Sequence, residues 1–384
     1  MHFRFFISAP QGDIELAPED LRQPFLLSPT EKHPFLTLED YFGALQKFIL
    51  SNQGKYLHDA LAKMNLPGNS SQADISEIRI HSEKHGAYYH IASINPFGVE
   101  KNVKLAVTTA LTEPAKVSLQ NEFFLLEQLA GRNSEFLPSL FCRQPVPWLT
   151  DSGEAEFYMV LGEWLADYHE WHLSENPAVK RRQIQLWDYE KGYRFLSDAE
   201  SYDLIRQAAY ILTIYYDPVT FSQIYPWHHG AGDFVVKAGA GTVKVKLITV
   251  RQYEPLVHFA QPEEHDRLVA AIQFLLNVSL RIRLDRIGGV GEPAWLGAFA
   301  VEGAVAGFFG GLDYASKTNN HIIGSVDEFL QIIRSFEARE ICDMYESLLE
   351  IYADEDQDDF RMIRKKLPDH AADLHAALKM YTPE

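Results

Sequence analysis

The 384-residue chain has very little cysteine. Only Cys142 and Cys342 occur, far apart in the sequence. A disulfide framework and a zinc site built on cysteines are therefore excluded. So little cysteine favours a reducing compartment, and we expect a cytoplasmic location.

The chain is also short of positive charge. Lys and Arg number 35 against 53 Asp and Glu, which gives a formal net charge of −18 at pH 7. A chain this acidic repels phosphate backbones and anionic lipid surfaces. We therefore expect no nucleic-acid partner.

Long hydrophobic runs are missing as well. The apolar residues Phe3–Ile7 are too few for a signal peptide. The longest apolar stretch, Trp295–Leu312, is interrupted by Glu302 and is half Gly and Ala. It predicts a closely packed buried helix and no membrane span.

What is present is enough apolar sequence for a large core, with 46% hydrophobic and 12% aromatic residues. Residues 1–36 have no clear period. Thr37 then has the features of a helix N-cap, and helical spacing continues to about residue 64. Breaker residues at 65–71 end this segment, so we expect an N-terminal helical extension over residues 1–72.

The pattern after this boundary alternates with period 2. It predicts a hairpin over residues 78–94, a third strand over 103–111, a helix from Pro114 to Ala130, and strands at 140–143 and 156–161. Beyond Glu163 the chain is expected to be mainly helical, with a capping box at Ser197. A loop and a second hairpin, over 234–236 and 243–248, interrupt this helical half.

This order of elements resembles the two-lobed fold of protein kinases and aminoglycoside-type phosphotransferases, over about residues 76–260. The resemblance implies an α+β fold. We expect a small mixed lobe at 73–162 and a mainly helical large lobe at 163–384, in addition to the extension at 1–72. It also implies that a nucleotide binds in a cleft between the lobes.

Several positions correspond to nucleotide contacts of this family. Gly86 stands where the family has a Gly-rich turn, although an ordinary hairpin glycine is the better explanation. Ala106 matches the residue that packs on adenine. Thr108 stands where the family has a phosphate-binding Lys, so that charge is missing.

Three further residues belong to the expected nucleotide site. Glu122 lies on the apolar face of its helix, like the family's helix Glu, and the alternative is a carboxylate at the edge of that face reaching water. Glu163 and Trp164 belong to a segment that is similar to the hinge between the lobes.

The catalytic loop of the family has its counterpart at Gly232-Asp233-Phe234-Val235-Val236. The resemblance makes Asp233 the counterpart of a metal-binding Asn. It puts His228 at the position of the catalytic Asp, and Thr249 at that of the second metal-binding Asp. Losing the strand Lys, the catalytic Asp and the second metal-binding Asp together removes most of what stabilises phosphoryl transfer.

The residues that remain in this loop have chemistry of their own. His228 and His229 are possible bases near pH 7, and with Asp233 they form a recognised set of metal ligands. The alternative is that they cap backbone groups of the loop. His169 and His172 have the spacing of one helical turn, which suits either a metal or aromatic packing. The acidic tract Asp354–Asp359 predicts a solvated connection between helices.

These observations lead to one preferred function and two alternatives. We expect a pseudokinase that binds ATP or another nucleotide with weak Mg²⁺ dependence, or binds a small molecule or protein partner. The first alternative is an active, atypical phosphotransferase for a small-molecule or lipid-like substrate, using His228, His229 and Asp233. The second is a metal-dependent hydrolase built on the same loop.

Overall fold

The computed structural model describes residues 2–9, 12–27, 31–64, 75–85, 88–98, 103–188, 191–229, 232–239, 241–259, 263–319 and 325–383. The chain divides into two units. Unit 1 comprises Met1–Ser134 and Pro138–Ala166, and unit 2 comprises Glu135–Leu137 and Asp167–Glu384. The domain boundary expected at residue 72 falls outside the described residues.

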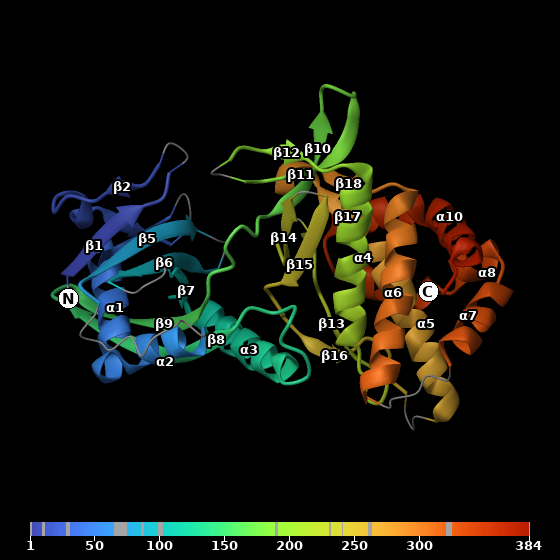
Figure 1. Ribbon diagram of the computed structural model, residues 1–384, viewed down its shortest axis with the longest axis horizontal. Helices are drawn as coiled ribbons and strands as arrows, with labels where there is room; N and C mark the ends of the chain where they lie inside the picture. Colours follow the sequence, from blue (N-terminus) through green and yellow to red (C-terminus); the bar gives the residue numbers. More distant parts are fainter. Residues whose placement is uncertain are drawn as a thin grey trace. The chain divides into compact units, whose positions relative to one another are not determined.

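Unit 1 is built on a seven-stranded sheet with the strand order β2-β1-β5-β6-β7-β9-β8 (Figure 1). The strands are β1 (His2–Ile7), β2 (Ile14–Glu15), β5 (Glu77–His85), β6 (His90–Phe97), β7 (Leu105–Ala110), β8 (Leu140–Thr150) and β9 (Gly153–Glu163). The expected hairpin and third strand are confirmed as β5, β6 and β7. The expectation of irregular chain at the N-terminus is wrong for residues 2–7, because β1 pairs in parallel with β5.

Helices cover both faces of this sheet. The N-terminal part also contains β3 (Pro24–Leu26), β4 (Lys32–Thr37), α1 (Leu38–Leu50) and α2 (Lys55–Lys63). As expected, Thr37 caps α1, in a capping box with Asp40. Residues of α1 and α2 share a core with one sheet face, whereas α3 (Glu113–Ala130) packs Leu119 and Phe123 on the opposite face. Within the predicted helical extension, α1 and α2 thus cover one face of the sheet.

Unit 2 contains more β structure than the sequence predicts. Four small sheets pair β10 (Trp171–Asn176) with β11 (Arg181–Leu186) and β12 (Arg194–Phe195), β13 (Ser222–Ile224) with β16 (Tyr253–Pro255), β14 (Phe234–Gly239) with β15 (Thr242–Leu247), and β17 (Leu284–Arg286) with β18 (Pro293–Trp295). The hairpin expected after Asp233 is confirmed as β14 and β15. The expectation of helix directly beyond Glu163 is wrong, since β10 to β12 occupy that region.

The helices of unit 2 are α4 (Asp198–Ile214), α5 (Glu264–Arg281), α6 (Ala298–Asn319), α7 (Val326–Ser335), α8 (Ala338–Asp343), α9 (Glu346–Ala353) and α10 (Gln357–Met380). Ser197 forms the predicted capping box at the start of α4. The apolar stretch near residue 300 is the buried helix α6, which lies along α4 (Figure 1). None of the described helices combines the length and the apolar character that a bilayer span requires.

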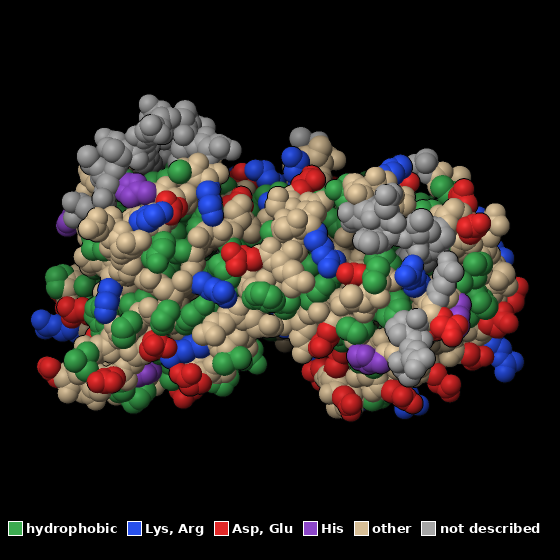
Figure 2. All heavy atoms as spheres, turned by 90° about the horizontal axis from the view of Figure 1, so that it is seen from below, with side chains coloured by type: hydrophobic (Ala, Val, Ile, Leu, Met, Phe, Trp, Pro, Cys, Tyr) green, Lys and Arg blue, Asp and Glu red, His purple; other side chains and the backbone are tan. Residues whose placement is uncertain are grey.

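Positive charge is dispersed on one face of the molecule. On the face shown in Figure 2, Lys and Arg side chains lie singly among acidic and apolar ones. The described part of this face therefore offers no broad basic patch to a phosphate backbone, which agrees with the net charge of −18.

Candidate functional site

Ala106 and Thr108 share one face of β7, because side chains alternate along a strand. Both are half-buried. Ala106 pairs with Ser93 on β6 and with Gly162 on β9. Ser93, Ala106 and Gly162 thus form a row of small residues across three neighbouring strands. This row lies on the face of the sheet that also carries Thr108.

A charged pair and an aromatic ring border this row. The Lys104 Nζ lies 2.7 Å from Glu83 Oε1 and 3.8 Å from the centroid of a Trp164 ring. The Ser93 hydroxyl donates to the same Glu83 oxygen at 2.6 Å. Burial opposes ionisation of Glu83, but the hydrogen bonds from Lys104 and Ser93 lower the pKa of Glu83 below its ordinary value. Lys104 is therefore engaged, and does not supply the amine that Thr108 lacks.

Two glutamates predicted to be functional lie in different surroundings. Glu122 is 8% exposed on α3, so it belongs to the buried face of the helix. Glu163 ends β9, and its Oε2 accepts a hydrogen bond from the Ser139 backbone N–H at 3.0 Å. Glu163 thus fastens the chain just before β8. Gly86 lies outside the described residues.

Asp233, in unit 2, is completely buried and paired with Arg251. The guanidinium donates from Nη1 to Oδ2 at 2.5 Å and from Nη2 to Oδ1 at 2.7 Å. The His228 backbone N–H also donates to Oδ2, at 2.8 Å. Both carboxylate oxygens are therefore occupied, and Asp233 holds the loop to the segment after β15.

Gly232 explains how the chain turns into Asp233. Its φ is +71°, a conformation that L side chains rarely adopt, and a Cβ there would lie 3.2 Å from Glu170 Oε1. The Gly-Asp sequence that resembles a catalytic loop is thus also required by the backbone and by the Arg251 pair.

His228 lies against the start of α10. Its Nε2 is 3.2 Å from Asp359 Oδ2, and the Arg286 Nη2 is 3.1 Å from the other oxygen of Asp359. Arg286 also reaches Asp356, the N-cap of α10, at 3.0 Å. The acidic tract is therefore more than a solvated connection, because it anchors the loop and β17 to α10.

His229 is enclosed by aromatic rings. It is 2% exposed, and its ring centroid lies 4.3 Å from that of Trp171 and 5.4 Å from that of Trp227. Its Nε2 is 3.0 Å from the Ile282 carbonyl oxygen, which makes Nε2–H the donor. Burial lowers the pKa of His229 to about 3, so the ring is neutral at pH 7.

These contacts do not fit a Mg²⁺ site of the kind the resemblance implies. Thr249 follows β15, is half-buried and carries no carboxylate. Both carboxylate oxygens of Asp233 already accept hydrogen bonds from Arg251. Within the ranges that the structure describes, no group of three or more His, Cys, Asp or Glu side chains could hold a metal ion.

Close to this loop, His172, which the sequence singles out, lies against Asp285, which it does not. His172 Nδ1 lies 3.5 Å from Oδ1 of Asp285, which is completely buried, and Nε2 lies 3.9 Å from Glu170 Oε2. Burial opposes the charged ring, yet Asp285 and Glu170 raise the pKa of His172 above its ordinary value. The spacing of His169 and His172 was the available signal, but the helical turn expected there is wrong, because His172 is in strand β10.

The predicted site residues thus form two groups. Ala106, Thr108, Glu122, Glu163 and Trp164 belong to unit 1, and His228, His229, Asp233 and Thr249 belong to unit 2. No protein-family model matches the chain, and no curated protein matches its sequence significantly.

Proposed function

We propose that this chain is a kinase-like protein without phosphotransfer chemistry, a pseudokinase, that binds a nucleotide with little dependence on Mg²⁺. The observation that carries the proposal is the pairing of Asp233 with Arg251. A guanidinium of this chain neutralises the carboxylate that a phosphotransferase of this kind would use for its metal.

The order of elements in unit 1 supports the kinase-like part of the proposal. A hairpin (β5 and β6) is followed by a third strand, a helix and two further strands in one sheet. On the sheet face that carries Ala106, both Ala106 and Trp164 are half-buried, so a flat ring could pack against them beside the buried Ser93 and Gly162.

The alternative of an active phosphotransferase has less support. A general base must reach the proton that it removes. His229 is enclosed and donates to a backbone carbonyl, His228 faces Asp359, and Asp233 is bound to Arg251. A metal-dependent hydrolase lacks support for the same reason, and because the described residues hold no metal-ligand cluster.

Thermal melts with ATP, ADP and AMP test the proposal, each in excess EDTA and in MgCl₂. A ligand at 100 times its dissociation constant stabilises by about 2.7 kcal/mol, which raises the melting temperature of a 384-residue chain by roughly 3 °C. We expect the same shift in EDTA as in MgCl₂, and similar shifts for ATP and ADP because Thr108 cannot clamp phosphate.

Two variants locate the nucleotide. Trp164→Ala should weaken the shift, whereas Trp148→Ala, which alters an aromatic residue on β8, should leave it intact. A shift that requires Mg²⁺, or release of phosphate from ATP, would contradict the loss of phosphotransfer. If no nucleotide changes the melting temperature at millimolar concentration, nucleotide binding is wrong.

A further inference from the structure

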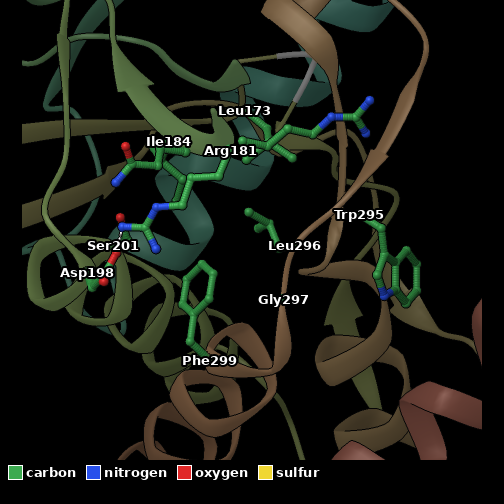
Figure 3. Close-up of a pocket in the computed structure, with 11 residues that line it drawn as sticks. Leu173, Arg181, Ile184, Asp198, Ser201, Trp295, Leu296, Gly297 and Phe299 are labelled. Carbon is green, nitrogen blue, oxygen red and sulfur yellow. Dashed lines mark hydrogen bonds and ion pairs between the residues drawn. The ribbon is translucent and has the colours of Figure 1, made fainter. Parts of the chain in front are cut away.

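Unit 2 contains a cavity that is separate from the loop around Asp233. Its volume is about 280 Å³, near the lower end of the range for small-molecule sites, which begins at about 300 Å³. Residues from β10, β11, α4 and the start of α6 line it (Figure 3). No residue assigned above to nucleotide binding takes part in it.

The cavity has an apolar floor. Leu173, Ile184 and Leu296 are each at most 3% exposed, and Phe299 adds a half-buried ring. In Figure 3 these side chains surround an open space, with the Phe299 ring facing Arg181. An apolar or aromatic group of a ligand would be desolvated here.

The rim carries charges of both signs. Arg181, Arg182 and Asp198 all line the cavity. Each arginine already has an acidic partner on the surface: Arg181 Nη2 lies 2.8 Å from Asp198 Oδ1, and Arg182 Nε lies 2.7 Å from Glu175 Oε1. These four side chains are 48–79% exposed, and exposed pairs contribute only about 0–1 kcal/mol, so a ligand anion can replace their acidic partners.

The helix α6 adds a second source of positive potential. It begins at Ala298, directly after Gly297, which lines the cavity, and its first turn contains no acidic residue. The backbone N–H groups in the first turn of a 22-residue helix favour an anion at this end.

From these features we infer that the cavity binds a small organic anion, an apolar or aromatic body that carries a carboxylate or phosphoryl group. The body packs on Leu173, Ile184, Leu296 and Phe299. The anionic group meets Arg181 and the start of α6. This inference is independent of nucleotide binding, because it concerns other residues in unit 2.

Phenylacetate is the probe that tests this inference, with 2-phenylethanol as its neutral counterpart and phenyl phosphate as the phosphoryl counterpart. Titration calorimetry should give a millimolar or lower dissociation constant for phenylacetate and at least roughly tenfold weaker binding of 2-phenylethanol. Tighter binding of phenyl phosphate than of phenylacetate would assign the anionic group as phosphoryl.

Three variants complete the test. Arg181→Gln should weaken the binding of phenylacetate by roughly tenfold or more. Arg361→Gln, which alters another exposed ion pair, on α10, should have no effect. Gly297→Leu should block binding; a Cβ there makes only ordinary contact with Phe299, at 3.5 Å, so the fold should tolerate it. Equal affinity for the neutral compound, or unchanged binding in Arg181→Gln or Gly297→Leu, would overturn the inference.

Discussion

At position 233 a carboxylate with no solvent exposure is paired with a guanidinium whose side chain is 39% exposed. The two partners are therefore not equivalent. Removing Arg251 leaves a charge buried without its counterion, whereas removing the charge of Asp233 leaves a guanidinium that water can reach. Breaking a buried pair by removing one partner costs roughly 3–5 kcal/mol.

We accordingly expect Arg251→Ala to lower the melting temperature by roughly 4–6 °C, and Asp233→Asn to lower it by less. Differential scanning calorimetry measures both. Arg361→Ala is the matched control, because Arg361 pairs with Asp358 on the surface, and it should change the melting temperature by about 2 °C or less. Equal effects of Arg251→Ala and Arg361→Ala would show that the buried pair does not hold the loop.

The pKa values of two buried histidines should be shifted in opposite directions. The pKa of His229 is lowered from 6.5 to about 3 by burial, and the pKa of His172 is raised by Asp285 and Glu170 despite burial. Imidazole NMR should therefore show His229 neutral at pH 5, and His172 with a midpoint above 6.5. A midpoint below 6.5 for His172 would refute the role of its two carboxylates.

The same shifts predict how stability depends on pH. The contribution of His229 is present above pH 6.5 and is lost as the pH falls toward 3, because only the unfolded chain binds the proton readily. The contribution of His172 is complete below pH 6.5 and is lost as the pH rises through its folded pKa. His172→Gln should consequently destabilise the protein more at pH 5.5 than at pH 8.5, as measured by urea midpoints.

At the scale of elements, the contact between α4 and α6 depends on glycine. A Cβ at Gly307 would lie 2.1 Å from the Arg206 carbonyl oxygen and 2.8 Å from the Ala209 Cβ. The small residues of this apolar stretch therefore let two helix backbones approach closely inside unit 2.

Gly307→Ala should lower the melting temperature by several degrees, since overpacking costs typically about 1–3 kcal/mol. Gly310→Ala on the same helix is the control. The nearest atom to its Cβ is 3.6 Å away, in the Tyr210 ring, and alanine favours a helix by up to about 1 kcal/mol over glycine. Gly310→Ala should leave the melting temperature unchanged or raise it, and a similar loss in both variants would argue against close packing at Gly307.

At the scale of the whole molecule, a net charge of −18 makes the folded chain repel itself. Salt screens this repulsion, as the Debye length falls from about 30 Å at 0.01 M to about 8 Å at 0.15 M. We expect the melting temperature to rise by a few degrees between 10 and 150 mM NaCl, measured in one buffer at pH 7.5. A fall over this range would mean that attraction between surface ion pairs outweighs the repulsion.

Elements whose signals are local can be predicted from the amino-acid sequence alone. Thr37 and Asp40 mark the start of α1, alternation marks β5 to β7, and the Gly- and Ala-rich stretch near residue 300 marks a buried helix. Capping and hydrophobic periodicity act over a few residues, so these elements can be read without knowing what they pack against.

The partners of individual residues, by contrast, depend on the folded chain. The pairing of β1 with β5, of Asp233 with Arg251, and of His172 with Asp285 joins residues far apart along the chain. The identity of a residue specifies its charge and size but not which distant group it meets, because that depends on how all the elements pack. For this reason the sequence predicted Asp233 to be a metal ligand, whereas in the folded chain Asp233 is paired with the Arg251 guanidinium.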